Sequence, residues 1–215
     1  MPNQLWMAAP LVAFDLEGTG GQDRENEAIL EVGVVPLAGG RPDVDRAYHS
    51  IVNPGRRIPR RPWSPPGLTS DMLALGPTLD HILPELMARL NGAYIVGHNV
   101  TVDWRLLSLR CPGIRPAALI DTLKLARLIR SGSRRNSLTA LLTHYQLTDE
   151  VFHLAVGGQP HRALWDAVGA GLLLRTLVEK LFGQTITVDK LRQVAGVPIN
   201  GEAMGYESGQ LPLLF

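Results

Sequence analysis

Acidic residues stand among apolar segments at three separate places in this chain. Asp15 and Glu17 come directly after the apolar run at residues 11–14. Asp103 and Asp166 lie in later apolar segments. A buried carboxylate is costly unless a cation or hydrogen-bond donors compensate for it. The fold therefore has to bring these carboxylates to a place where something compensates for their charge.

The first part of the chain is predicted to form strands. We expect strands over residues 11–14, 28–37 and 47–52, because each is rich in apolar residues and is followed by glycine, asparagine or an acidic residue. Gly39 and Gly40 are expected to close the second strand as a turn. Three such strands suggest an antiparallel meander.

Apolar residues at helical spacing follow a proline-rich segment. The expected elements are a helix at 78–91, a strand at 94–96, helices at 102–109 and 137–145, a strand at 118–120 and a long helix at 162–181. Asp121 is predicted to cap a further helix. This order indicates an α/β domain with a mixed sheet flanked by helices.

We expect one domain over residues 1–182 and a C-terminal extension over residues 183–215. A chain of 215 residues is long enough to bury one ordinary core. The extension is predicted to contain a small helix at 187–195 and a mobile linker at 196–210, because the linker is rich in glycine and polar residues.

Composition excludes several classes of protein. Hydrophobic residues make up 45% and charged residues 19% of the chain, which is typical of a globular domain. No apolar stretch reaches the ~20 residues of a membrane span, and the N-terminus lacks a signal-peptide pattern. Cys111 is the only cysteine. No internal disulfide is therefore expected, and a reducing cytoplasm is the default location.

The net charge of +1 excludes a strongly basic coat but not a local basic patch. Arginine is dense at residues 56–61 and again at Arg127, Arg130, Arg134 and Arg135. These clusters are either contacts to nucleic acid or ordinary solvated charges of loops and helices.

Asp15 and Glu17 have the spacing of a pair of metal ligands on a strand, where side chains at i and i+2 point to the same side. Mg²⁺ and Mn²⁺ prefer such oxygen ligands. Two ions about 3.5–4 Å apart can hold the attacking water and the leaving oxygen of a phosphodiester. Asp103 and Asp166, each near a predicted helix start, are placed to supply further carboxylates.

His161 suits a different task, because Mg²⁺ does not favour imidazole. A histidine beside a metal-bound water is better used as a general base, since its pKa lies near the working pH. Its position after the loop at residues 157–160 is expected to let it move into place.

Taken singly, each motif has a simpler interpretation. Asp-x-Glu after an apolar run is common in turns, Asp103 suits a helix cap, and His161 with Asp166 suits a surface pair. Asp121 fits the cap role so well that we leave it out of the catalytic set. Specificity comes from the combination and its order.

The motifs together resemble those of the DEDDh (DnaQ-like) 3′–5′ exonucleases. The segments that carry the resemblance are residues 14–20 (FDLEGTG), 97–103 (GHNVTVD) and 161–167 (HRALWDA). The similarity extends over roughly residues 10–182. It implies a ribonuclease-H-like fold.

The resemblance also implies a role for each residue of the site. Asp15, Glu17 and Asp166 would bind the first of two divalent cations, Mg²⁺ or Mn²⁺. Asp15 would share the second cation with Asp103, and His161 would deprotonate the attacking water. The product would be nucleoside 5′-monophosphates released from the 3′ end of single-stranded DNA, in proofreading or repair.

The motifs further predict the residues that contact substrate, which are Gly18, Thr19, Leu68, His98 and Asn99. Residues 65–69 lack a histidine that this loop carries in the family. Leu68 and Trp63 are then expected to supply apolar surface against a base, with core packing as the alternative. Val102 stands where many members have Phe, which we interpret as a change in packing.

The C-terminal residues resemble short peptides that bind the bacterial sliding clamp. The contacts are expected from Gln210, Leu211, Leu213 and Phe215, which form an extended apolar peptide. The alternative is that these residues fold back onto the domain. A DNA polymerase is a further expected partner, and residues 183–209 are the candidate segment for it.

Two other functions fit parts of the pattern. A 3′–5′ exoribonuclease of the same family would carry the same motifs. A clamp-bound adaptor would keep the fold without the chemistry, but all five expected catalytic positions hold competent residues.

Overall fold

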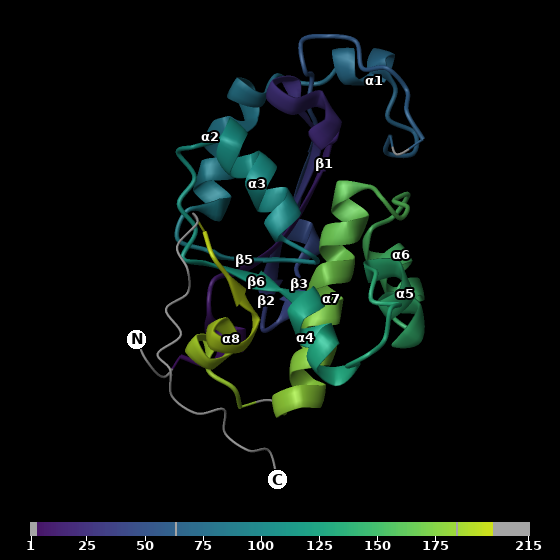
Figure 1. The fold of residues 1–215 in the computed structure, drawn as a ribbon. Coiled ribbons are helices and arrows are strands. Elements are labelled where there is room, and N and C mark those ends of the chain that lie inside the picture. Colours follow the sequence, from purple (N-terminus) through teal and green to yellow (C-terminus); the bar gives the residue numbers. More distant parts are fainter. Residues whose placement is uncertain (1–3, 63, 184, 200–215) are drawn as a thin grey trace.

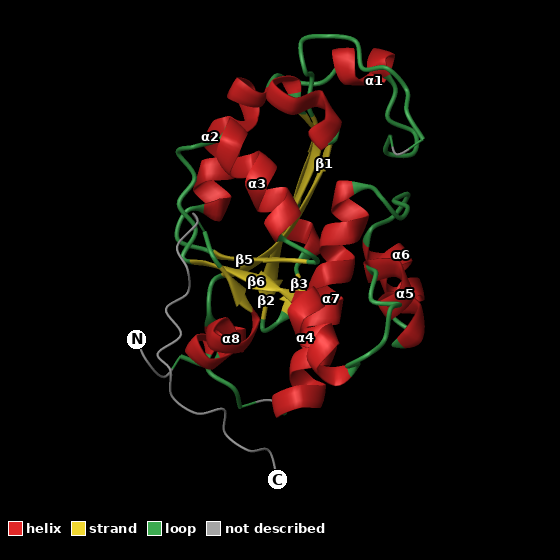
Figure 2. Cartoon of the chain, in the orientation of Figure 1, coloured by secondary structure: helices red, strands yellow, loops and turns green. Residues whose placement is uncertain are grey.

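A seven-stranded mixed sheet forms the centre of the computed structural model, which describes residues 4–62, 64–183 and 185–199. Its order is β3-β2-β1-β5-β6-β7, with β4 also paired to β2. Figure 2 shows the strands in yellow with the helices in red around them. The strands are β1 (Leu11–Gly18), β2 (Ile29–Ala38), β3 (Arg41–Pro42), β4 (Tyr48–Ile51), β5 (Tyr94–Gly97), β6 (Ala118–Asp121) and β7 (Gly196–Val197). The expected mixed sheet is confirmed.

The pairing explains how the sheet is built. β1, β2 and β4 form the expected antiparallel meander, whereas β5 and β6 are parallel to β1. β1 continues through the acidic pair to Gly18, beyond the predicted end at Asp15, because β2 supplies a pairing partner for each residue up to Glu17. The acidic side chains therefore sit on regular strand rather than in a turn.

Helices cover both faces of the sheet (Figure 1). They are α1 (Ser70–Ala74), α2 (Leu79–Leu90), α3 (Thr101–Arg110), α4 (Thr122–Ile129), α5 (Leu138–His144), α6 (Thr148–Leu154), α7 (Ala163–Phe182) and α8 (Val188–Ala195), with 3₁₀ helices η1 (Trp6–Ala8), η2 (Gly21–Asn26) and η3 (Val44–Arg46). Short α1 and α6 have no counterpart in the sequence prediction. None of the helices in the described ranges is long and apolar enough to cross a membrane.

Alternating side chains of β1 divide the core into two clusters. Leu11 and Ala13 pack with residues of α4, α7 and α8. Val12, Phe14 and Leu16 pack on the other face with residues of α2 and α3. This period-two alternation fixes which face every later residue of β1 presents.

Helix α7 lies very close to the sheet, because small residues face it. A Cβ atom on Gly171 would lie 3.5 Å from Cβ of Ala13. At the start of the helix, a Cβ atom on Gly33 of β2 would lie only 2.4 Å from the carbonyl oxygen of Ala163. The first turn of α7 is thus placed directly over β2, beside the end of β1.

The helix that follows β6 begins as predicted. The side chain of Asp121 accepts a hydrogen bond from the backbone N–H of Leu123 at 2.9 Å, which confirms its role as a cap. The same carboxylate accepts a second hydrogen bond from the N–H of Asn99 at 2.8 Å. Asp121 therefore also fixes the start of the segment that leads into α3.

The end of the described chain joins the same core. Val188, Leu191 and Ala195 of α8 are buried in the cluster that contains α7. Gly196–Val197 pair with β6, so the prediction of a mobile linker is wrong at these two residues. The predicted clamp-binding residues lie beyond 199 and, like Trp63, fall outside the described residues.

Candidate active site

Three carboxylates meet at the end of β1. Asp15 and Glu17 continue the face of β1 that packs against α7, and Asp166 lies in the first turn of that helix. One oxygen from each of the three lies within 4.8 Å of the others. The close packing of α7 on the sheet thus brings together residues that are about 150 positions apart in the sequence.

Asp103 approaches from the opposite face of the sheet. It lies in the first turn of α3 and is only 7% exposed. The backbone N–H of Leu16 donates to Asp103 Oδ1 at 3.4 Å. This contact places the carboxylate beside the residue between Asp15 and Glu17.

Burial and mutual repulsion hold protons on the cluster. Burial, helped by the charges of Asp103 and Asp166, raises the pKa of Asp15 well above its ordinary value. Burial also raises the pKa of Glu17 to about 9 and the pKa of Asp103 to about 7. The pKa of Asp166 is raised to about 6, because burial outweighs the opposing effect of His161. Such shifts are typical of carboxylates that share one site.

The donor set fits a divalent cation. Asp15 Oδ2 and Asp166 Oδ1 are buried, and neither has a hydrogen-bond partner in the described part of the chain. Buried oxygens without donors are costly. A hard cation bound by both would satisfy them, and the surrounding ligands are all carboxylates of the kind that Mg²⁺ and Mn²⁺ prefer.

His161 stands at the rim of this cluster. Its side chain is exposed, and its backbone φ is 64°. The backbone N–H of His161 donates a hydrogen bond to the carboxylate of Asp166, and the His161 ring lowers the pKa of that carboxylate. The structure thus brings His161 next to Asp166, within a segment whose next residue, Arg162, is tightly held.

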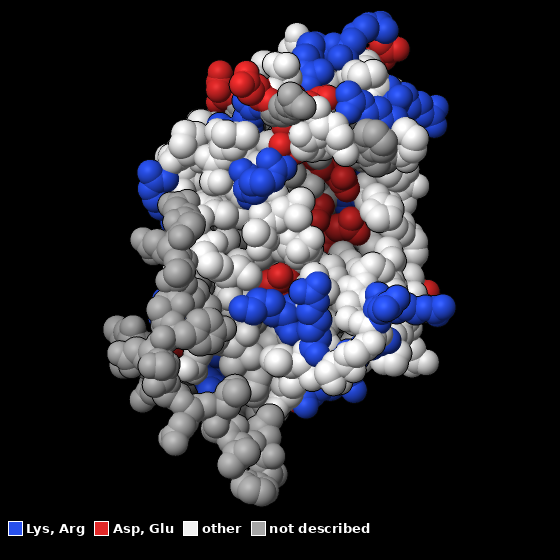
Figure 3. Space-filling view, in the orientation of Figure 1, with Lys and Arg blue, Asp and Glu red and all other residues white. Residues whose placement is uncertain are grey.

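A cleft of about 210 Å³ opens beside the carboxylates. Glu17 and Asp103 line it together with Gly18, Val102 and Leu106. Figure 3 shows acidic side chains in a hollow of this face, with basic side chains on either side. Val102 is 55% exposed in the wall of this cleft, and its interpretation as a change in packing stays a prediction.

Two of the side chains predicted to contact substrate instead form hydrogen bonds within the fold. His98 places Nδ1 2.8 Å from Thr122 Oγ1 and Nε2 2.8 Å from the carbonyl oxygen of Asn136. Thr19 is 5% exposed and accepts a hydrogen bond from the N–H of Ala28 at 3.1 Å. We therefore propose supporting roles for these two side chains.

The other predicted contacts lie nearer to solvent. Asn99 is exposed and adopts a φ of 63°. Leu68 is half-buried in the loop that approaches the segment of His161, where Gln159 Nε2 donates to the carbonyl oxygen of Pro66 at 3.3 Å. Gly18 lines the cleft, and a Cβ atom there would lie 2.7 Å from Leu106 Cδ2.

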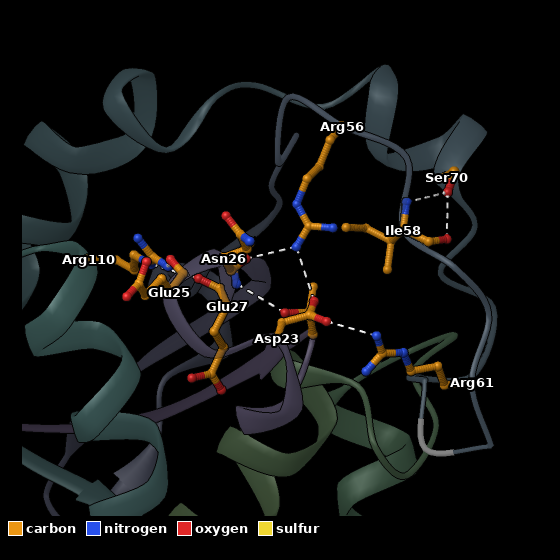
Figure 4. Close-up of polar contacts among 11 residues, drawn as sticks. Asp23, Glu25, Asn26, Glu27, Arg56, Ile58, Arg61, Ser70 and Arg110 are labelled. Carbon is orange, nitrogen blue, oxygen red and sulfur yellow. Dashed lines mark hydrogen bonds and ion pairs between the residues drawn. The ribbon is translucent and has the colours of Figure 1, made fainter.

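Arginines hold the connection between β1 and β2 from two sides (Figure 4). Arg56 and Arg61 both pair with Asp23, at 3.0 and 2.8 Å. Arg56 also donates to the carbonyl oxygen of Asn26 at 2.8 Å, and Arg110 donates to two further carbonyls of this segment. Much of the basic cluster at residues 56–61 is therefore structural. A hollow of about 330 Å³ beside it contains none of the clustered carboxylates.

A family model described as Exonuclease matches residues 12–171. This chain belongs to the exonuclease family. The DEDDh (DnaQ-like) resemblance is thereby confirmed, and it is supported by a relative of similar length. This exonuclease is 31% identical over 175 residues to the epsilon subunit of DNA polymerase III from Aquifex aeolicus, with 80% of this chain and 81% of the relative covered.

Other relatives are much longer. Over 175 residues, the exonuclease is 34% identical to the PolC-type DNA polymerase III of Thermotoga maritima, which covers 78% of this chain but 12% of the relative. It is 27% identical to the 3′–5′ exonuclease DinG of Bacillus subtilis, of which it spans 18%. The chain thus spans less than a fifth of these two relatives.

Solved structures share the fold. Exonuclease X in complex with 5′ overhanging duplex DNA superposes with a TM-score of 0.65 at 24% identity, covering 86% of this chain and 98% of that one. The nuclease domain of 3′hExo, a DEDDh family member bound to rAMP, gives a TM-score of 0.62 at 16% identity, covering 81% and 94%. The ribonuclease-H-like fold of this exonuclease is confirmed.

Three residues that hold the site together were not predicted from the sequence. Arg162, just before α7, donates to Glu31 of β2, and Gly33 of β2 lies against the backbone of Ala163. One signal was present, since Glu31 is a charged residue within an apolar strand and Arg162 directly follows His161.

Proposed function

We propose that the protein is a metal-dependent 3′–5′ exonuclease that acts on single-stranded or frayed DNA and releases nucleoside 5′-monophosphates, in proofreading or repair. One observation carries the proposal. Carboxylate oxygens of Asp15, Glu17 and Asp166 lie within 4.8 Å of one another on an exonuclease fold, with His161 beside Asp166.

Two divalent cations, Mg²⁺ or Mn²⁺, would occupy the site. Asp15, Glu17 and Asp166 would hold the first, and Asp15 with Asp103 the second. When bound, such cations supply positive charge to the attacking and leaving oxygens of a phosphodiester. The unpaired buried oxygens Asp15 Oδ2 and Asp166 Oδ1 support this assignment.

The chain's own residues then divide the remaining work. His161 takes the proton of the attacking water on an imidazole nitrogen, and its exposed position lets the proton pass on to solvent. Gly18, Val102 and Leu106 offer small and apolar surface to the terminal nucleotide within the cleft. Leu68 and Asn99 are proposed to contact the substrate at the rim.

Exposed arginines suit the rest of the strand. Arg127, Arg134 and Arg135 are exposed, and none has an acidic partner within the described ranges. Arg127 lies on α4, and the contact between His98 and Asn136 ties the loop of Arg134 and Arg135 to the end of β5. We propose that these arginines contact backbone phosphates next to the cleft.

DNA is the proposed substrate, because the relatives of higher identity include a PolC-type DNA polymerase III and the epsilon subunit of a DNA polymerase III. An exoribonuclease is the second candidate, since the same fold occurs in a protein described as recognising the 3′ end of a histone mRNA stem-loop. A non-catalytic adaptor is disfavoured by the clustered carboxylates.

Matched DNA and RNA oligonucleotides, labelled at the 5′ end and incubated with Mg²⁺, test the proposal. We expect a ladder that shortens from the 3′ end on DNA, with nucleoside 5′-monophosphates as products. An Asp15→Asn variant controls for contaminating nuclease. Faster loss of RNA would favour the exoribonuclease, and no cleavage of either strand would overturn the proposal.

A further proposal concerns Gln210, Leu211, Leu213 and Phe215, which we expect to bind the sliding clamp of a DNA polymerase complex. Deleting residues 210–215 should abolish binding to purified clamp while leaving nuclease activity on free oligonucleotides unchanged. Clamp affinity that survives the deletion would remove this proposal.

A further inference from the structure

A further buried acidic residue lies beside the site but outside the carboxylate cluster. Glu31 of β2 is 0% exposed and pairs across the sheet with Glu17. Its Oε2 accepts from Arg162 Nε at 2.8 Å and from the N–H of Ala163 at 3.3 Å. Its Oε1 lies 2.7 Å from Arg162 Nη2 and 2.5 Å from His49 Nε2. Glu31 is therefore fully paired, unlike the carboxylates next to it.

These partners keep Glu31 ionised. Burial alone would raise its pKa, but hydrogen bonds from His49 and Arg162 hold the pKa below its ordinary value. A carboxylate with two-pronged guanidinium contact is a geometrically demanding pair, because both N–H groups must lie in one plane. The pair thus fixes the direction of the Arg162 side chain as well as its charge.

Arg162 connects this buried carboxylate to the segment of His161. Its carbonyl oxygen accepts the hydrogen bond from the N–H of Asp166 at 3.0 Å. On its other side, a Cβ atom on Gly67 would lie 3.6 Å from Arg162 Nη1. Arg162 is thus held between the sheet, the start of α7 and the loop of Gly67.

His161 directly precedes this anchored residue. Its backbone φ of 64° is a conformation that residues other than glycine rarely adopt, so the surrounding contacts must maintain it. We propose that Glu31 is a positioning residue for His161, which it holds over the carboxylate cluster by fixing the guanidinium of Arg162. The inference rests on the proposed function, in which His161 takes the proton from the attacking water.

A second ion pair of the same chemistry provides a matched control. Glu27 is 3% exposed, and its two oxygens accept from Arg105 at 2.7 Å each. Arg105 lies in α3, which is not the segment that carries His161. Loss of the Glu27 pair should therefore act independently of His161, whatever its effect on the rate.

A double-mutant cycle tests the proposal. Glu31→Gln and His161→Ala are made singly and together in the full chain, and kcat and KM are measured on single-stranded DNA with saturating Mg²⁺. We expect Glu31→Gln to lower kcat by roughly 10- to 100-fold, a partial loss of the roughly 10²- to 10⁴-fold that general-base catalysis contributes, and to change KM by less than about twofold. In the His161→Ala background, it should lower kcat by less than about twofold.

Glu27→Gln should change kcat by the same factor in both backgrounds. Equal losses for Glu31→Gln in both backgrounds would show a purely structural role and overturn the proposal. If Glu31→Gln does not fold, as judged by circular dichroism, Arg162→Lys takes its place. Lysine keeps the charge but cannot make the two-pronged contact, so the same coupling to His161 is expected.

Trypsin supplies a readout that does not depend on nuclease activity. In the wild-type protein the Arg162 side chain is held by Glu31, so cleavage after Arg162 should be slow. Glu31→Gln should accelerate this cleavage at least several-fold, as followed by mass spectrometry. Unchanged cleavage would overturn the anchoring, whereas absence of nuclease activity in the wild-type protein would overturn only the proposed function.

Discussion

Gly33 lies directly beneath Ala163, so closely that a Cβ atom on Gly33 would come within 2.4 Å of the Ala163 carbonyl oxygen. Gly33 is also the cross-strand partner of Asp15. The absence of one side chain in β2 therefore sets the height of α7 above the sheet at the point where Asp166 meets Asp15.

Gly33→Ala should disturb this contact. Because the clash is with backbone, we expect a loss of stability of about 1–3 kcal/mol or more, together with weaker Mg²⁺ binding. Thermal unfolding and isothermal titration with Mg²⁺ measure the two effects. Gly21→Ala is the matched control, since a Cβ atom there meets nothing within 4 Å. A Gly33→Ala protein with wild-type metal affinity would contradict the proposed link between α7 and the cluster.

Asp15→Asn should separate activity from stability. Burial, together with the charges of Asp103 and Asp166, raises the pKa of Asp15, so keeping this group in the fold at neutral pH costs free energy. Asparagine avoids this cost, and the replacement is expected to raise the melting temperature in EDTA. Activity with Mg²⁺ should fall below roughly 1% of wild type, because a ligand shared by both proposed cations is lost. Differential scanning fluorimetry and the oligonucleotide assay check the pair of effects. Retained activity would refute the ligand assignment.

The raised carboxyl pKa values predict how stability depends on pH. Asp166, Asp103 and Glu17 have pKa values raised to about 6, 7 and 9 in the fold, whereas such groups titrate near 4 in an unfolded chain. The folded state therefore binds protons more tightly, and its stability in EDTA should decrease as the pH rises from about 5 to about 9.

Divalent cations should reverse this trend. Mg²⁺ binds the ionised carboxylates, so the rise in melting temperature on adding Mg²⁺ should grow over the same pH range. Thermal unfolding with EDTA and with Mg²⁺ across this range measures both slopes. A melting temperature in EDTA that climbs with pH would show that the carboxyl groups are not held protonated in the metal-free fold.

Removing Arg127, Arg134 and Arg135 together should weaken binding to single-stranded DNA. The slope of the logarithm of the binding constant against the logarithm of salt concentration should become less steep by about 2, because three phosphate contacts are lost. Fluorescence anisotropy in Ca²⁺ measures binding without depending on turnover. A triple alanine variant at Arg41, Arg46 and Arg192, which are exposed arginines on other elements, removes the same charge and should keep the wild-type slope.

The sequence predicted the strands and helices that carry the site, because their apolar periodicity is strong. It also grouped Asp15 with Glu17 correctly on one face, since alternation along a strand is a local rule. The approach of Asp166 depends on the glycine at position 33, which is far away in the sequence. The resemblance to the exonucleases predicted that Asp166 joins Asp15 and Glu17, but apolar periodicity does not show which helix packs over which strand, so only the fold shows how Asp166 reaches them.

Contacts between residues far apart in the sequence also could not be predicted. The His98 ring contacts Thr122 and Asn136 because three segments of the chain cross at this point. The exposure of Val102 depends on how far α3 is rotated about its axis. Local composition specifies neither property.

Asp103 reaches the end of β1 from α3 and Asp166 reaches it from α7, and these helices belong to the two clusters of the core on opposite faces of the sheet. The proposed centre is therefore complete only when both halves of the molecule have closed on β1. A chain that has assembled one layer alone lacks a full set of ligands. Nuclease activity is therefore expected only from molecules in which both layers have folded. The activity of a preparation would then measure the fraction of such molecules.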